Sequence, residues 1–175
     1  MDFTIILYVI IGILFLYVII VFNRLILLKN GVKTTFSQVD VLTKKRIELI
    51  PRLAEFTKKY SSYEKNVLTE VSKLRTEISS SKNEALISEI FVKSGTIMNN
   101  LMIISEKYPN LKANDNFKKL FEENTIVENE IMRMRLVYNN LVEKYNNTLS
   151  IFPNNLISNF FNFKVKEFLD FELKK

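Results

Sequence analysis

Four glutamates that stand close together form the densest group of side chains able to do chemistry in this sequence. Carboxylate oxygens are the ligands that Mg²⁺ and Ca²⁺ prefer, so a carboxylate-dependent hydrolase is one candidate function. Carboxylates are also the normal side chains of a protein surface, and a solvated helix face is the favoured interpretation. The four residues are Glu122, Glu123, Glu128 and Glu130.

The chain contains neither histidine nor cysteine, which excludes most catalytic arrangements. Ser-His-Asp and Cys-His constellations, an ordinary zinc site and a di-iron site with Glu-x-x-His pairs all need one of these residues. Gly12, Gly31 and Gly95 are too far apart to form a phosphate-binding loop. We therefore predict a non-enzymatic protein with no cofactor and no catalytic or metal site, and no small-molecule substrate is identified.

The elements that position the remaining residues begin with an uncharged apolar run from Phe3 to Phe22. Twenty residues in a helix span roughly 30 Å, the thickness of the hydrocarbon core of a bilayer. The run lacks the basic start and the Ala-x-Ala-like ending of a signal peptide. We expect residues 1–22 to be a retained transmembrane anchor and residues 23–175 to form a cytoplasmic helical domain.

Basic residues follow the apolar run directly. Between Asn23 and Tyr60, nine Lys or Arg residues face three Asp or Glu residues. Positive charge beside a span marks its cytoplasmic side, which predicts an N-terminus outside and a C-terminal domain inside. Arg24, Lys29 and Lys33 are near enough to attract anionic lipid headgroups. The rest of the chain is nearly balanced in charge and shows no nucleic-acid motif, so no nucleic-acid partner is expected.

Few chain breakers and two long apolar seams predict an all-α protein. Three Gly and three Pro in 175 residues favour long helices. The seams repeat in alternating steps of three and four residues, as helices that pack together do. The first contains Thr35, Val39, Leu42, Arg46, Leu49, Leu53, Phe56 and Tyr60; the second contains Phe117, Leu120, Asn124, Val127, Ile131, Met134, Tyr138, Leu141, Tyr145, Thr148 and Phe152.

Breaks in the sequence separate the helical segments. They predict that the transmembrane helix is followed by an antiparallel up-and-down bundle of three to four long helices. Pro51 is expected to kink the first helix, and Pro153 to end the last one. A loop is expected around residues 79–83, and Asn114 is a plausible helix cap. Arg46 falls on an apolar seam and would need a buried partner, which Glu130 or Glu128 could supply.

The last segment, residues 154–175, is a tail rich in phenylalanine. In the favoured interpretation it folds back and caps the bundle. Alternatively, it offers an exposed aromatic surface that binds a membrane or a protein partner. The residues in question are Phe160, Phe161, Phe163, Phe168 and Phe171.

Two blocks of the sequence resemble the LemA family. The first comprises Phe22–Ile26, Asn30–Val32, Phe36–Val41 and Lys45–Leu53; the second comprises Tyr108–Asn114 and the pairs Glu128-Asn129, Tyr138-Asn139, Tyr145-Asn146 and Phe152-Pro153. Phe22 and Phe36 replace the family's usual Tyr and Trp. The family-motif positions singled out are Ser37, Gln38, Asp40, Arg46, Pro51, Tyr138, Asn139, Tyr145, Asn146, Phe152 and Pro153.

This resemblance implies a protein of the bacterial inner membrane, with one N-terminal span and a cytoplasmic helical bundle, but it implies no agreed activity. We therefore predict a membrane-anchored scaffold or adaptor, with envelope maintenance as its suggested process. Its expected partners are the lipid bilayer and either another protein or a second copy of the chain. A lipid-binding or membrane-remodelling protein is the alternative, and the carboxylate-dependent hydrolase is the minor one.

Overall fold

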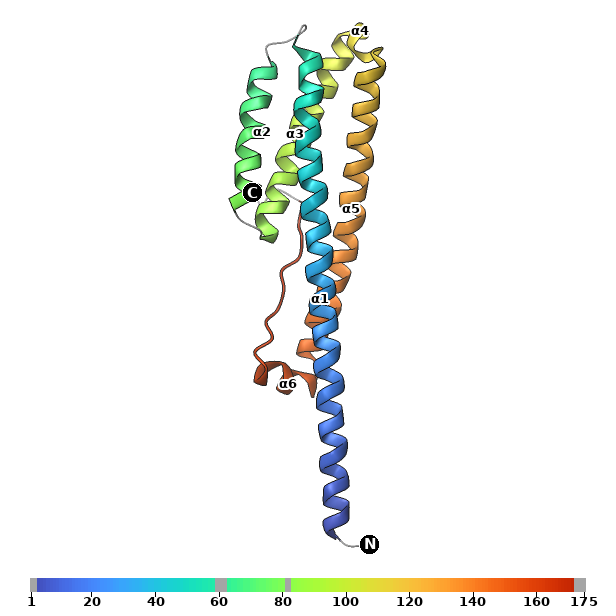
Figure 1. Ribbon diagram of the computed structural model, residues 1–175, viewed down its shortest axis with the longest axis vertical. Coiled ribbons are helices and arrows are strands. Elements are labelled where there is room, and N and C mark those ends of the chain that lie inside the picture. The colour runs from blue at the N-terminus through green and yellow to red at the C-terminus, as the bar shows by residue number, and fades with distance from the viewer. Residues whose placement is uncertain (1–2, 59–62, 81–82, 172–175) are drawn as a thin grey trace.

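One long helix joins the apolar N-terminal run to the rest of the protein. The computed structural model describes residues 3–58, 63–80 and 83–171, and its first helix, α1, runs from Phe3 to Thr57. These 55 residues extend for about 80 Å. The helix continues through Pro51 without a break (Figure 1). Ile50 and Leu53, on either side of the proline, are fully buried, so their packing in the core stabilises the helix across Pro51.

Three further long helices complete an antiparallel bundle around the C-terminal part of α1. They are α2 (Tyr63–Ser80), α3 (Glu84–Lys107) and α5 (Asp115–Ser150), and the short α4 (Pro109–Lys112) links α3 to α5. The helix α5 is the main partner of α1 and lies along it beyond the ends of α2 and α3 (Figure 1). The described residues contain no strand, and the predicted all-α bundle is confirmed.

Local capping signals set the helix boundaries as the sequence predicts. The side chain of Asn114 accepts hydrogen bonds from the backbone N–H groups of Asn116 and Phe117, at 3.0 and 3.1 Å. Asn83 caps α3 in the same way through the N–H of Leu86. These contacts satisfy N–H groups that have no partner inside the helix. The expected break near residue 80 is therefore also confirmed.

The two predicted seams form the core with one exception. The described members of the first seam are buried or half-buried, while Tyr60 lies outside the described residues. The second seam is buried or half-buried as far as Thr148, but Phe152 is 75% exposed. The helix α5 ends at Ser150, before Pro153, so Phe152 no longer follows the helical register that would direct it inward.

No described part of the protein packs around the N-terminal part of α1. Every residue from Phe3 to Leu16 is exposed, whereas Val21 and Leu25 are buried against the bundle. Within the described residues, α1 is the one helix long and apolar enough to cross a membrane, and only 6% of its apolar window is buried.

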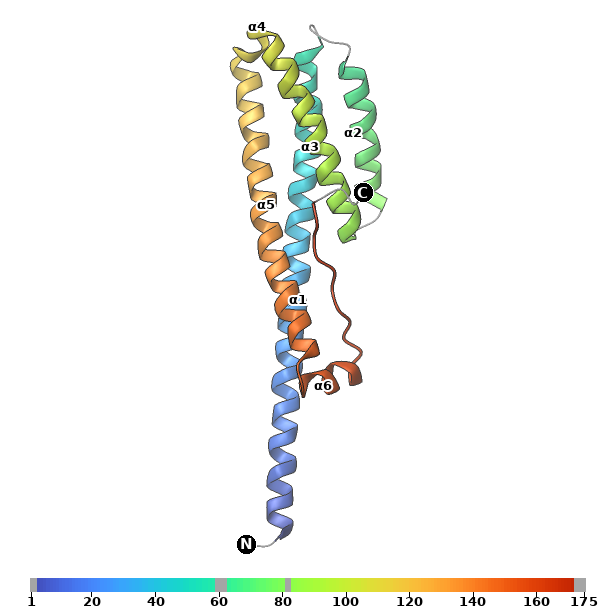
Figure 2. The same cartoon turned by 180° about the vertical axis from the view of Figure 1, so that it is seen from behind.

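The chain reverses direction after α5. The short helix α6 (Asn154–Phe160) contacts both α1 and α5 and lies across the lower end of the bundle (Figure 1). Two residues after its end, Asn162 has a left-handed backbone conformation at φ 55°. The N–H groups of Asn162 and Phe163 bond back to Asn159 and Ser158, a common C-terminal motif of helices. Residues 163–171, which we call the strap, then run in an extended conformation toward α3 (Figure 2).

Candidate functional site

Two asparagines of α5 hold the backbone of the strap. The side-chain amide of Asn146 donates to the C=O of Lys166 and accepts from its N–H, both at 2.9 Å. The amide of Asn139 binds Leu169 in the same way, at 3.1 and 2.9 Å. Because one amide offers both a donor and an acceptor, it can satisfy the N–H and the C=O of a single residue. Seven residues separate the two asparagines, which places them on the same face of α5.

Tyr138 and Arg135, on the same helix, also bind the main chain of the strap. The buried hydroxyl of Tyr138 lies 3.0 Å from Glu84 Oε1 and 3.0 Å from the C=O of Glu167. Burial first, and then the charge of Glu84, raise the pKa of Tyr138, so its hydroxyl stays a hydrogen-bond donor. Arg135 Nε donates to the C=O of Leu169 at 3.0 Å. The strap is therefore bound through its main chain.

The aromatic residues of the tail divide into packed and exposed members. Phe171 stacks on Phe91 of α3, with ring centroids 4.1 Å apart. Phe163 is half-buried and its ring lies 5.8 Å from that of Phe22. In contrast, Phe160 and Phe168 are exposed, and Phe161 is 43% exposed with its ring against those of Phe22 and Phe160. Of the two interpretations of the tail, packing on the bundle therefore applies to Phe163 and Phe171. An exposed aromatic surface applies to Phe160, Phe161 and Phe168.

A buried arginine lies in the core between α1, α3 and α5. The guanidinium of Arg46 is fully buried, 3.3 Å from Glu128 Oε1 and 4.6 Å from the centre of the Phe91 ring. Its Nη1 also donates a long hydrogen bond of 3.4 Å to the C=O of Phe91. Burial lowers the pKa of Arg46, and the charge of Glu128 opposes this effect. Of the two predicted partners, Glu128 is confirmed.

The other glutamates of the acidic group face different partners. Glu123 pairs with Lys45 at 3.0 Å, and Glu130 pairs with Arg133 at 3.0 Å. Glu122 lines a separate depression beside Phe117. Across residues 3–58, 63–80 and 83–171, no three acidic side chains gather in a way that could hold a metal ion.

An open groove between α1 and α5 contains two family-motif residues that do not serve the core. Ser37 and Gln38 are both exposed in it, whereas their neighbour Asp40 is buried and pairs with Lys44 at 2.9 Å. We call it the α1–α5 groove, and its lining residues are Thr34, Ser37, Gln38, Val41, Leu42, Glu130, Arg133 and Met134. This mixture of polar and apolar side chains is typical of a surface that contacts another protein.

The basic residues beside the apolar run are exposed, as a headgroup-binding role requires. Arg24, Lys29 and Lys33 all face solvent. Lys29 Nζ also lies 5.7 Å from the ring centre of Phe163, so the start of the strap reaches the level of these charges. About two helical turns before Arg24, the hydroxyl of Tyr17 donates to Asn154 Oδ1 of α6 at 2.6 Å.

Sequence reasoning singled out Asn139 and Asn146 but missed what they do. An extended segment without apolar periodicity gives no sign of where it packs, and its contacts with α5 cross 20 to 30 residues. The available signal was the repeat itself: two Tyr-Asn pairs, seven residues apart, put two amides on one helix face. In the structure these two amides bind the backbone of the strap.

Comparison with known proteins identifies the family. No curated protein matches the chain. A sequence model described as the LemA family matches residues 35–175. The matched residues include the bundle, α6 and the strap, and thus the motif residues from Ser37 to Pro153; the apolar run and its first basic flank precede the match. Because the match covers most of the chain, the protein belongs to the LemA family.

Proposed function

We propose that this protein is a non-enzymatic adaptor anchored in the inner membrane of a bacterium, with the α1–α5 groove as its docking surface for another protein. The observation that carries the proposal is the continuity of α1. The same helix provides the apolar span and one wall of the groove, with no flexible joint between them. A partner bound there would be held at a fixed distance from the bilayer.

The basic flank gives the proposed orientation. Arg24, Lys29 and Lys33 follow the apolar run and are exposed, which favours a cytoplasmic position for the bundle. With that orientation, Ser37 and Gln38 lie about 20 Å beyond the end of the span at Phe22. The groove would then be clear of the headgroups but close to the membrane surface.

The chemistry of the groove favours a protein ligand. Val41 is exposed and Leu42 is half-buried, and polar residues of the groove surround them. An apolar centre with a polar rim is typical of a protein–protein interface. The Glu130–Arg133 pair is exposed on both sides and therefore worth little by itself. Both charged groups can exchange this contact for one with a partner.

Site-specific photocrosslinking in native membranes tests the proposal. A photoreactive amino acid at the position of Val41 should capture one protein repeatedly, and the capture should be lost when Gln38→Ala and Arg133→Ala are combined with it. A photoreactive group at Asn99, exposed on α3, serves as the matched control. Recovery of lipid alone, of the chain itself alone, or of the same proteins from both positions would refute the adaptor.

Lipid binding by the bundle is the second candidate, and the exposed aromatic residues near α6 favour it. It predicts that the chain lacking residues 1–22 still binds anionic vesicles and that salt weakens this binding. Absence of binding at low salt would exclude it.

A further inference from the structure

The helix α6 has an apolar face that no part of the described protein covers. Phe152, just before the helix, and Leu156 and Phe160 within it are spaced four residues apart and are 75%, 61% and 84% exposed. The opposite face is packed: Ile157 is buried, and the hydroxyl of Ser158 bonds to the C=O of Leu149 at 3.1 Å. Leu156 and Phe160 therefore lie on the face of α6 that does not pack on the bundle, and Phe152 adds a third exposed apolar side chain just before the helix.

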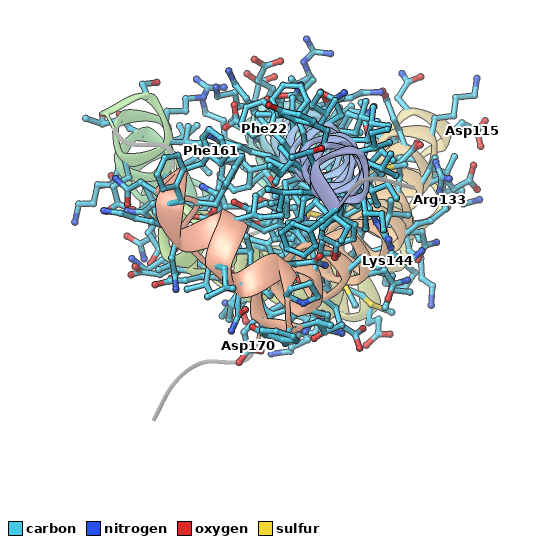
Figure 3. All side chains as sticks on the ribbon, turned by 90° about the horizontal axis from the view of Figure 1, so that it is seen from below. Phe22, Asp115, Arg133, Lys144, Phe161 and Asp170 are labelled. Carbon is cyan, nitrogen blue, oxygen red and sulfur yellow. The ribbon has the colours of Figure 1, made fainter. Side chains whose placement is uncertain are left out.

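This apolar face lies beside the end of the span. Asn154, at the start of α6, accepts the hydrogen bond from Tyr17, and the ring of Phe161, just after it, lies 4.8 Å from that of Phe22. Figure 3, viewed from the N-terminal end, shows Phe22 and Phe161 close together beside α6. Both ends of α6 are thus held against α1 between Tyr17 and Phe22, at the level of the exposed Ile20 of the apolar run.

The depth of α6 follows from the length of the span. If Phe3 and Phe22 mark the two edges of the hydrocarbon core, its middle falls near Gly12. Tyr17 and Phe22 then lie about 8 and 15 Å from the middle, on the side of the basic flank. Helices that lie in a membrane interface bury their apolar face about 5–10 Å below the headgroups, which is the same level.

We infer that α6 inserts Phe152, Leu156 and Phe160 into the leaflet from which α1 emerges, at the boundary between headgroups and acyl chains. The inference rests on the membrane anchoring in the proposed function. The charges around α6 fit this occupant, since Arg24, Lys29 and Lys164 are exposed just beyond it and can meet anionic headgroups. The hydrogen bond between α1 and α6 pairs the hydroxyl of Tyr17 with the amide oxygen of Asn154 at that depth, which lowers the cost of placing both groups there.

A second membrane contact has a mechanical consequence. A single span tilts freely within the range that its neighbours allow. With α6 in the interface, the chain meets the bilayer at two places that are joined through Tyr17, Phe22 and the strap. The bundle is then held in one orientation, and the α1–α5 groove faces a fixed direction relative to the membrane.

Single tryptophan probes in the full-length chain test the insertion, because the protein contains no tryptophan. Three variants, Phe160→Trp, Leu14→Trp and Ile126→Trp, are reconstituted in vesicles of phosphatidylcholine and phosphatidylglycerol. All three positions are exposed in the structure, so the substitutions leave the packing intact. Leu14 lies in the span, and Ile126 lies in the N-terminal half of α5, which is the half farther from the span. Lipids brominated at different depths of the acyl chain then quench the fluorescence.

We expect the F160W probe to emit at short wavelength and to lose most of its emission to lipid brominated near the headgroup end of the chain. The L14W probe should be quenched most by bromine near the terminal methyl group, and the I126W probe only by a quencher in water. If L14W is quenched by lipid but F160W behaves like I126W, the insertion of α6 is wrong and the anchor stands. If neither L14W nor F160W is quenched by lipid, the membrane anchor itself is wrong, and the insertion with it.

Discussion

The residues from Phe152 to Phe171 form two regions that meet the bundle in different ways. In the strap, Leu169 is fully buried and Phe171 stacks on the bundle. In α6 and just before it, Phe152 and Phe160 extend away from the protein. Both regions are rich in phenylalanine, so hydrophobicity alone does not decide which one the bundle covers.

The backbone explains the difference. An extended segment has no internal hydrogen bonds, and its N–H and C=O groups need partners before its side chains can be buried. Asn139 and Asn146 provide those partners, so the strap packs on protein. In α6, bonds within the helix and its flanking turns pair part of the backbone: the N–H of Asn155 bonds to Ile151, and the N–H of Phe161 bonds to Ile157. The apolar face of α6 can therefore meet lipid at a lower cost than an extended segment could. The bundle therefore binds the strap through its main chain, whereas it packs on one face of α6 and leaves the other face exposed.

The largest expected effect comes from the buried side of the strap. Leu169→Ala should lower the free energy of unfolding by about 3 kcal/mol, because a fully buried leucine leaves a cavity. Chemical denaturation of the full chain in detergent measures it. The neighbouring Phe168 is 52% exposed, and Phe168→Ala is the matched control with a loss well below that of L169A. Equal losses would mean that the strap is not seated as described.

The ion pair between Arg46 and Glu128 in the core of the bundle gives a second stability change, with which the losses at the strap can be compared. Glu128→Gln should cost about 2 kcal/mol, since it leaves Arg46 buried without an ionic partner. The full penalty of such a loss is moderated here because the Glu128 side chain is 41% exposed and water can approach it.

Arg46→Met should by contrast leave the unfolding midpoint unchanged or raise it, because it removes the charge together with its need for a partner. A severe loss of stability in R46M, as large as in E128Q or larger, would show that Arg46 itself is indispensable to the core.

The asparagine contacts should matter less than the buried leucine. Asn139→Ala removes two hydrogen bonds to Leu169 and should cost about 1.5 kcal/mol. Asn146→Ala removes an equivalent pair at an exposed site, where water replaces the lost bonds, and should cost about 0.5 kcal/mol. Thermal unfolding of both variants measures the order, and a reversed order would contradict the burial that distinguishes them.

Alkaline pH should loosen the strap through Tyr138. Its pKa is raised in the folded protein, whereas in the unfolded chain a tyrosine loses its proton near pH 10. The stability from the buried neutral phenol is therefore complete below about pH 10 and is lost as the pH rises toward the higher folded pKa. Unfolding followed from pH 9 to 11 should show a steeper loss for the natural chain than for Tyr138→Phe. Parallel curves would mean that Tyr138 titrates normally.

The smallest effect on folding is expected at α6. Phe160→Ala should change the free energy of unfolding in detergent by less than about 0.5 kcal/mol, because the ring has little protein around it. Phe161→Ala, which removes the contact with Phe22, should cost more. A loss in F160A above that of F161A would place Phe160 in a protein core and contradict its exposure.

The sequence predicted the parts of the fold that depend on periodic burial. The seams from Thr35 and Phe117, the cap at Asn114 and the partner of Arg46 all follow from helical spacing and the cost of burying a charge. The division of the tail could not be predicted, because it depends on contacts between α5 and residues that have no period of their own. The exposure of Phe152 was missed for a related reason: the seam was extended past Ser150 into a turn that Pro153 ends.

Amide hydrogen exchange in lipid nanodiscs tests most directly the claim that the bundle binds the strap through its backbone. The N–H groups of Lys166 and Leu169, which bond to Asn146 and Asn139, should exchange more slowly than those of Val165 and Phe168. In Asn139→Ala, protection should fall at Leu169 and remain at Lys166. Uniformly fast exchange from residue 163 to 171 in the natural chain would contradict the account.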